Sequence, residues 1–312
     1  MDTKFKSSGE LAAAITRSAS RQTYYTIRFL VDRSLVADAY RAYGYFRWVD
    51  DVIDSNGGTR DERIAFAHRQ KALLDSCYRN ETTPDLSPEE RILVDLVHND
   101  RENYSGLQVY LRNMMEVMLF DAERRGRLVP QAELSEYSHK LAIAVTEALY
   151  FFIGHDDPAP CHEARYMSVI AAHMTHMLRD TLEDVQAGYY NIPREVVARG
   201  VSAQNVESDL YREWVCGRVQ LARGYFKAGR ECTAQVRNLR CRLAGYAYTA
   251  RFEWMLDAIE RENYCLRCEY PERKSLQAGL WMAWSVLKEL VSLPALRISH
   301  KLAVQTARIG KQ

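Results

Sequence analysis

Two acidic clusters constrain the fold of this 312-residue chain more than any other feature. Each cluster sets two aspartates four residues apart: Asp50 and Asp54 in the first, Asp180 and Asp184 in the second. On an α-helix this spacing places both carboxylates on one face, about one turn apart. Apolar and aromatic residues surround both pairs, so we expect these faces to be partly buried. Like charges on such faces are tolerated mainly when cations neutralise them, which predicts that the two acidic faces meet around bound cations.

The ligand atoms indicate which cation this is. Oxygen-only clusters suit Mg²⁺, which keeps several waters and often binds through carboxylates together with substrate phosphates. We therefore predict Mg²⁺ as the cofactor and all four aspartates as its ligands. The alternative interpretation is that each pair lies on a solvated helix, where aspartates at i and i+4 repel each other only modestly.

Hydrophobic periodicity predicts an all-α fold. Apolar residues recur mostly at helical spacing, and the sequence lacks convincing alternating runs of the kind that form strands. Turn-forming residues interrupt this pattern in five short stretches: 55–58, 82–88, 126–130, 154–160 and 199–204. None of them is long enough for a domain linker. We expect a polar N-terminal segment, residues 1–19, and one large helical bundle, residues 20–312, with a central cavity where the acidic clusters meet.

Composition excludes several classes of protein. The formal net charge is +1 with acidic and basic residues interspersed, whereas a nucleic-acid-binding surface would show a basic excess, so we expect no nucleic-acid partner. The seven cysteines are scattered, with one close pair at Cys265 and Cys268, which indicates free thiols in a reducing cytoplasm. The polar first ten residues lack the apolar core of a signal peptide.

No apolar run in the sequence is long enough to cross a membrane, so we expect no transmembrane segment. Residues 280–293 are apolar and aromatic with few charges. This segment either packs as a terminal helix or contacts a membrane surface, and the sequence leaves such peripheral contact open.

Three motifs extend the acidic clusters into a longer pattern: Arg47-x-x-Asp50-Asp51-x-x-Asp54, then Tyr137 in Glu133-Leu134-x-x-Tyr137-Ser138, then Leu178-Arg179-Asp180-x-x-Glu183-Asp184-x-x-x-Gly188 with Pro193. In order and approximate spacing this pattern resembles the squalene and phytoene synthase family, over residues from about 20 to 270. The resemblance implies an isoprenoid synthase fold. It also implies a Mg²⁺-dependent reaction in which an allylic prenyl diphosphate ionises and a carbon nucleophile captures its carbocation.

That chemistry gives further residues a role. The aspartates would hold Mg²⁺ ions that bridge diphosphate oxygens. Arg47 and Arg179 are placed to add bidentate contacts to phosphate, or else they form salt bridges with the neighbouring aspartates. A carbocation needs a dry pocket with aromatic faces, for which Tyr24 is a candidate. The resemblance implies that Tyr43 and Tyr137 are active-site tyrosines.

Departures from the family pattern lie around the predicted pocket. After Gly188 the family continues with an arginine and, two residues further, an aromatic residue, whereas this chain has Tyr189 and Asn191 at those places. Small residues that follow the family's tyrosine are larger here, among them Ile143. His176 stands where the family has Asn or Gln, and it either contacts phosphate or metal or is structural. We expect all four of these substituted positions to contact the substrate.

These changes leave the ionisation residues in place but fill the pocket, which favours a short donor. Some bacterial relatives prenylate aromatic acceptors such as carbazoles with dimethylallyl diphosphate. We therefore expect transfer of a short, dimethylallyl-type group to carbon of an aromatic or other non-isoprenoid acceptor, with Tyr137 or the released diphosphate as the base. Three alternatives remain open: head-to-head condensation of two farnesyl or geranylgeranyl diphosphates, cyclisation of a single donor, and a non-catalytic homologue.

Overall fold

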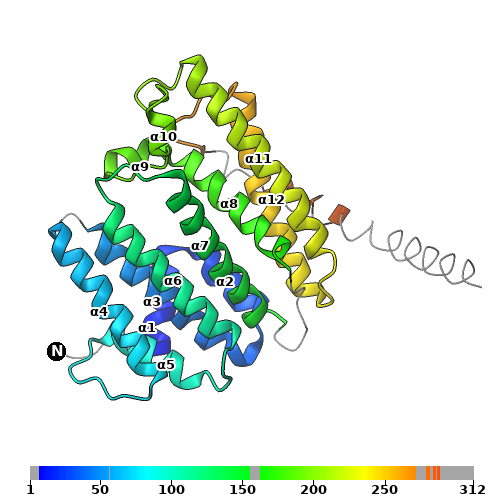
Figure 1. Ribbon diagram of the computed structural model, residues 1–312. Coiled ribbons are helices and arrows are strands. Elements are labelled where there is room, and N and C mark those ends of the chain that lie inside the picture. Colours follow the sequence, from blue (N-terminus) through cyan, green and yellow to red (C-terminus); the bar gives the residue numbers. More distant parts are fainter. Residues whose placement is uncertain are drawn as a thin grey trace, which may run out of the picture.

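A computed structural model shows a bundle of helices, with no strand among the residues that it describes: 7–55, 57–154, 162–271 and several positions between 279 and 288 (Figure 1). The all-α prediction is confirmed. The helices are α1 (Ser8–Ala19), α2 (Arg21–Leu30), α3 (Val36–Asp54), α4 (Arg60–Tyr78), α5 (Pro88–Asn99), α6 (Gly106–Arg124), α7 (Gln131–Phe152), α8 (Ala164–Arg179), α9 (Thr181–Ala187), α10 (Arg194–Val197), α11 (Asp209–Thr233) and α12 (Leu239–Arg261). A single 3-10 turn, Arg33–Leu35, precedes α3.

Capping residues determine where helices begin after the predicted breaks. Thr59 caps α4 and Ser87 caps α5, and in each case the third helical residue, Glu62 or Glu90, accepts a hydrogen bond from the backbone N–H of the cap. These reciprocal bonds satisfy N–H groups that the first turn leaves without partners. Four of the five predicted breaks fall between helices or at a helix start, and 154–160 lies mostly outside the described residues.

The apolar core has two parts. One lies among α1 to α7, where Tyr45 and Leu111 are fully buried, and the other lies among α8, α11 and α12, around Phe226 and Leu256. Helix α8 packs on α7 and on α11, and Figure 1 shows it between them. Because α8 packs on α7, the second acidic cluster, which begins at the end of α8, lies beside the part of the core formed by α1 to α7.

Helix α1 lies within the stretch 1–19 that we set apart as a polar N-terminal segment, and it packs on α3. Ala12 of α1 is fully buried, and a Cβ at Gly44 of α3 would lie 2.9 Å from its carbonyl oxygen. At the other end of the chain, most of residues 280–293 lie outside the described part. Within the described part, no helix is long and apolar enough to span a membrane.

Candidate active site

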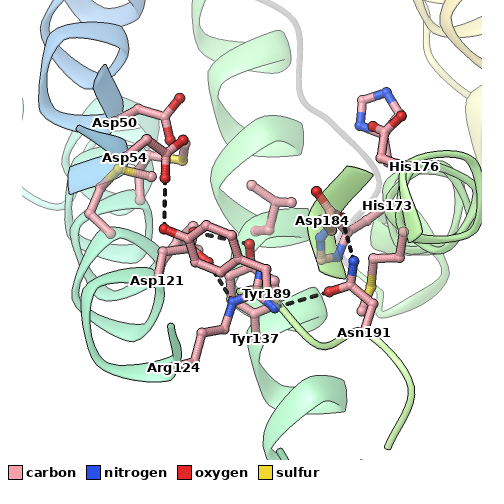
Figure 2. A pocket seen from close by; sticks show the side chains of 16 residues that line it. Asp50, Asp54, Asp121, Arg124, Tyr137, His173, His176, Asp184, Tyr189 and Asn191 are labelled. Carbon is pink, nitrogen blue, oxygen red and sulfur yellow. Dashed lines mark hydrogen bonds and ion pairs between the residues drawn. The ribbon is translucent and has the colours of Figure 1, made fainter. Parts of the chain in front are cut away.

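The two acidic pairs converge on one cavity of about 290 Å³. Figure 2 shows how side chains from α3, α6, α7, α8 and α9 and from the loop after α9 point into it. Its lining comprises Asp50, Asp54, Met114, Val117, Met118, Asp121, Arg124, Tyr137, Leu141, His173, His176, Met177, Asp180, Asp184, Tyr189 and Asn191. The prediction that the acidic clusters meet in a central cavity is thus confirmed in its geometry.

The first acidic pair lies at the C-terminal end of α3. Val49 and Ile53, on the neighbouring face, are buried in the core, so the helix presents Asp50 and Asp54 to the cavity. Burial, reinforced by the charges of Asp54 and Asp121, raises the pKa of Asp50 to about 7. The C-terminal end of a helix also disfavours negative charge, because its carbonyl groups carry partial negative charge. Both effects leave this pair in need of a cation.

The second acidic pair does not lie on one unbroken helix. Helix α8 ends at Arg179 and α9 begins at Thr181, so Asp180 occupies the junction, with φ −96° and ψ 3°. The N–H of Asp184 still donates to the carbonyl of Asp180 at 2.8 Å, and this turn keeps both carboxylates at the cavity. Burial, followed by the charge of Asp180, raises the pKa of Asp184 to about 6.

An arginine from α6 lies between the two acidic pairs. Arg124 donates from Nε to Asp121 Oδ1 at 2.7 Å and from Nη1 to Asn191 Oδ1 at 3.0 Å. Its Cζ lies 4.9 Å from the ring centroid of Tyr189 and 5.0 Å from that of Tyr137. The side chain is 8% exposed. Burial lowers its pKa, but Asp121, Tyr137 and Asp184 together outweigh burial, so the pKa is raised above its ordinary value and the guanidinium stays charged. The site therefore contains a permanent buried cation.

The loop after α9 connects this arginine to both acidic pairs. Gly188, with φ 90°, ends α9 and turns the chain toward the cavity. The Tyr189 hydroxyl then donates to Asp54 Oδ1 at 2.6 Å, and Asn191 Nδ2 donates to Asp184 Oδ2 at 2.5 Å. Tyr189 and Asn191, which we expected at the substrate, line the cavity and hold one aspartate of each pair (Figure 2).

Tyr137 and His173 form the wall that α7 and α8 contribute. The Tyr137 hydroxyl donates to Asp121 Oδ2 at 3.0 Å, and burial raises its pKa well above the ordinary value, so the phenol stays protonated. His173 Nδ1 lies 3.0 Å from the Ser138 hydroxyl, and burial lowers the imidazole pKa to about 3. His176 also lines the cavity, with its ring against Phe252 at 4.7 Å between centroids.

Five of the expected site residues do not line the cavity. Arg47 pairs with Asp50 at 3.3 Å and with Asp51, and Arg179 donates from Nε to Asp180 at 2.6 Å, so both arginines make the salt bridges that we held as their alternative role. Tyr24 and Tyr43 pack against the core among α1 to α7. Ile143 is half-buried on α7, outside the cavity lining.

Sequence reasoning missed Asp121 and Arg124. They are three residues apart, and Asp121 directly follows the stretch 114–120, which is apolar except for Glu116. An acidic and a basic residue at this spacing, next to an apolar stretch of a helix, can indicate a buried ion pair. Ordinary surface salt bridges have the same spacing, so the signal is weak.

The four aspartates suit a hard cation. Among the described residues, no group of three or more His, Cys, Asp or Glu side chains stands together as a complete metal site. Mg²⁺ does not require one, because it is usually bound by one or two carboxylates and completes its shell with water and substrate phosphate. Two pairs of carboxylates that line one cavity fit that ligand set, and in each pair one aspartate, Asp50 or Asp184, has a raised pKa.

Comparison with known proteins agrees with this arrangement. The profile of the squalene/phytoene synthase family matches residues 16–278. The squalene synthase HpnC from Alicyclobacillus acidocaldarius superposes with a TM-score of 0.67 at 20% identity, covering 83% of this chain and 95% of that chain. A complex of TcSQS with the ligand BPH1237 gives a TM-score of 0.61 at 12% identity, covering 92% of each chain. No curated protein sequence matches the chain.

At these identities the two structures establish the fold, which is the isoprenoid synthase fold. The family comprises prenyltransferases that use prenyl diphosphates and typically depend on a divalent metal. With its sequence profile matched over most of the length, the chain belongs to the squalene/phytoene synthase family.

Proposed function

We propose that this protein is a Mg²⁺-dependent prenyltransferase that ionises a short allylic diphosphate and transfers its prenyl group to carbon of an aromatic acceptor. The observation that carries the proposal is the meeting of four aspartates, from α3 and from the α8–α9 junction, around one cavity that also holds the cation of Arg124.

Ionisation is the first step. The allylic C–O bond breaks, and its electron pair leaves with the diphosphate. The four aspartates would hold Mg²⁺, which would supply positive charge to stabilise the leaving diphosphate. Arg124 adds a fixed positive charge in a site shielded from water, where electrostatic stabilisation is strongest. Since Asp121 and Asn191 hold its guanidinium, this charge needs no rearrangement during the reaction.

The apolar end of the cavity receives the carbocation. Met114, Met118 and Leu141 line that end and exclude water, which would otherwise quench the cation. Methionine sulfur is polarisable and tolerates a nearby cation. The rings of Tyr137 and Tyr189 are less available for this purpose, because Arg124 lies over both of them.

Capture and deprotonation complete the transfer. The π electrons of the acceptor form the new C–C bond, and the resulting ring cation loses a proton to regain aromaticity. Tyr137 is a poor base, because its pKa is raised and its hydroxyl already donates to Asp121. The released diphosphate oxygen accepts the proton.

Cavity size supports the short donor. A volume of about 290 Å³ lies at the lower end of ligand pockets, which span roughly 300–1,000 Å³. Leu141 occupies part of the apolar end that a longer prenyl chain needs.

The test supplies Mg²⁺ with dimethylallyl, geranyl, farnesyl or geranylgeranyl diphosphate, with and without aromatic acceptors, and measures pyrophosphate release and product masses. Release that requires both a short donor and an acceptor supports the proposal. Acceptor-independent products from a long donor establish head-to-head coupling or cyclisation instead, and no release with any donor indicates a non-catalytic homologue. The double variant Asp50→Asn/Asp180→Asn, checked for folding by circular dichroism, is the inactive control.

A further inference from the structure

A second cavity adjoins the active site. It encloses about 470 Å³ between α7, α8 and α11. Met177 and Asn191 line both this cavity and the one that holds the aspartates. These two side chains therefore form a wall that the two cavities share, and Met177 is unbranched and adaptable.

One wall of the second cavity carries an arginine without a counter-ion. Arg218 of α11 is half-buried, and it makes no hydrogen bond or ion pair within the described part of the chain. Burial lowers its pKa, which reports that its charge is poorly solvated. One and a half turns along the same helix, Arg223 shows the usual arrangement, pairing with Asp257 at 2.7 Å and with Glu260. A half-buried guanidinium with no anion is destabilising unless a ligand supplies one.

The rest of the lining is about half apolar or aromatic and half polar, and Ser135, Ser138 and His139 are among its polar members. Ile170 and Met174 of α8 face Tyr225 of α11 across the cavity. The one carboxylate in the lining is Glu136, which is 67% exposed and pairs with Lys140 at 3.1 Å. It therefore leaves the charge of Arg218 available. A cavity with an apolar and aromatic side, polar groups and one arginine suits a flat molecule that has an anionic end.

We propose that this cavity binds the acceptor substrate and that the acceptor is an aromatic carboxylate. Its carboxylate pairs with Arg218 in the bidentate geometry that guanidinium groups favour. Its ring lies against Tyr225 and Met174 and reaches the reaction cavity past Met177 and Asn191. This inference rests on the proposed function, which it narrows from aromatic acceptors in general to aromatic acids.

Direct binding tests the site without turnover. Calorimetric titration of the full chain compares para-coumarate with its uncharged amide, and with inorganic pyrophosphate as a second anion. We expect the acid to bind roughly 10- to 100-fold more tightly than the amide, as for a hydrogen bond to a charged group. Arg218→Gln should abolish that difference and Arg218→Lys should retain part of it. Lys227→Gln, which removes an exposed charge on the same helix outside both cavities, should leave it unchanged.

The inference is overturned if the acid and the amide bind with equal affinity. It is also overturned if the protein binds pyrophosphate but not the aromatic acid. A transfer assay with dimethylallyl diphosphate separates this inference from the proposed function. If the acid binds more tightly than the amide, this preference depends on Arg218, and no prenylated product forms, the binding site is supported and the proposed transfer reaction is rejected. Prenylation of acid and amide alike, unaffected by Arg218→Gln, supports the transfer reaction and removes Arg218 as the acceptor's anchor.

Discussion

The Tyr189 hydroxyl donates a 2.6 Å hydrogen bond to Oδ1 of Asp54, joining the loop after α9 to the last residue of α3. Burial, with this hydrogen bond, raises the pKa of Tyr189, so the contact comes from a neutral donor. The family pattern has an arginine at this position, which would have brought a positive charge. In this chain the positive charge comes instead from Arg124 of α6, which stacks on the same tyrosine ring.

Removal of the Tyr189 hydroxyl tests this contact. Tyr189→Phe keeps the ring on Arg124 but leaves Asp54 without its donor, and we expect a loss of about 1 kcal/mol in the free energy of unfolding. Mg²⁺-dependent pyrophosphate release should fall roughly tenfold, because Asp54 is no longer held in place. Urea denaturation and the release assay measure the two effects. Tyr190→Phe is the matched control, since the Tyr190 hydroxyl makes no hydrogen bond within the described residues; equal effects of the two changes would contradict this role.

Removal of the buried cation should be more harmful. Arg124→Met leaves the 14%-exposed side chain of Asp121 without its partner, and we expect a loss of about 3–5 kcal/mol in unfolding free energy. Adding Asp121→Leu should recover much of this loss, because the double variant no longer buries the Asp121 carboxylate without its arginine. Arg127→Met is the control: its pair with Glu133 is 41% exposed on both sides, and its loss should cost less than about 1 kcal/mol. Additive losses in the double variant would argue against a coupled pair.

The raised pKa of Asp50 predicts a pH dependence of stability. Its ordinary value is 3.8 and its folded value is about 7, so between these pH values the folded protein binds a proton that the unfolded chain does not. The free energy of unfolding therefore decreases as pH rises through this window, and Asp50→Asn removes that contribution. About a third of the side chain contacts solvent, so we expect a small effect: without metal, the variant should melt about 2 °C above wild type at pH 8. At pH 4 the two proteins should melt together, and a constant difference in thermal melts at both pH values would refute the assignment.

Donor length should depend on Leu141. Leu141→Ala enlarges the apolar end of the active-site cavity, and we expect the ratio of kcat/KM for geranyl over dimethylallyl diphosphate to rise roughly tenfold or more. Ile143→Ala, on the same helix but outside the cavity lining, should leave the ratio unchanged. Steady-state kinetics with both donors measure this ratio. If Ile143→Ala raises the ratio more than Leu141→Ala does, Leu141 is not the residue that limits donor length.

The contact between α8 and α11 depends on Gly229. A Cβ at this position would lie 2.6 Å from the backbone nitrogen of Ser168, so Gly229→Ala must push the helices apart, and we expect a loss of about 1–3 kcal/mol in unfolding free energy. Gly224 of the same helix has no atom within 4 Å of its Cβ position, and Gly224→Ala should stabilise the protein by about 0.5–1 kcal/mol. Urea denaturation of both variants checks the difference in sign.

The candidate site could be predicted from the sequence only in part. The aspartates were found because a spacing of four residues has a fixed meaning on a helix. The break at Asp180 was not, because the contacts that hold the turn after it, such as the hydrogen bond from the Tyr189 N–H to the Asp184 carbonyl at 2.7 Å, involve a loop whose path the local pattern does not set. The arginines nearest to the aspartates in sequence, Arg47 and Arg179, turned out to pair with their neighbours.

The sequence by itself determined that the chain is helical and that its carboxylates occur in pairs, since both properties depend on spacing within a few residues. Only the tertiary structure decided which cation faces those carboxylates. Arg124 and Asn191 are 67 positions apart, and their hydrogen bond forms because the end of α6 packs beside the loop after α9. The charge and position of a buried cation depend on the groups that surround it and exclude water. Those groups come from distant parts of the chain, so the local sequence does not determine them.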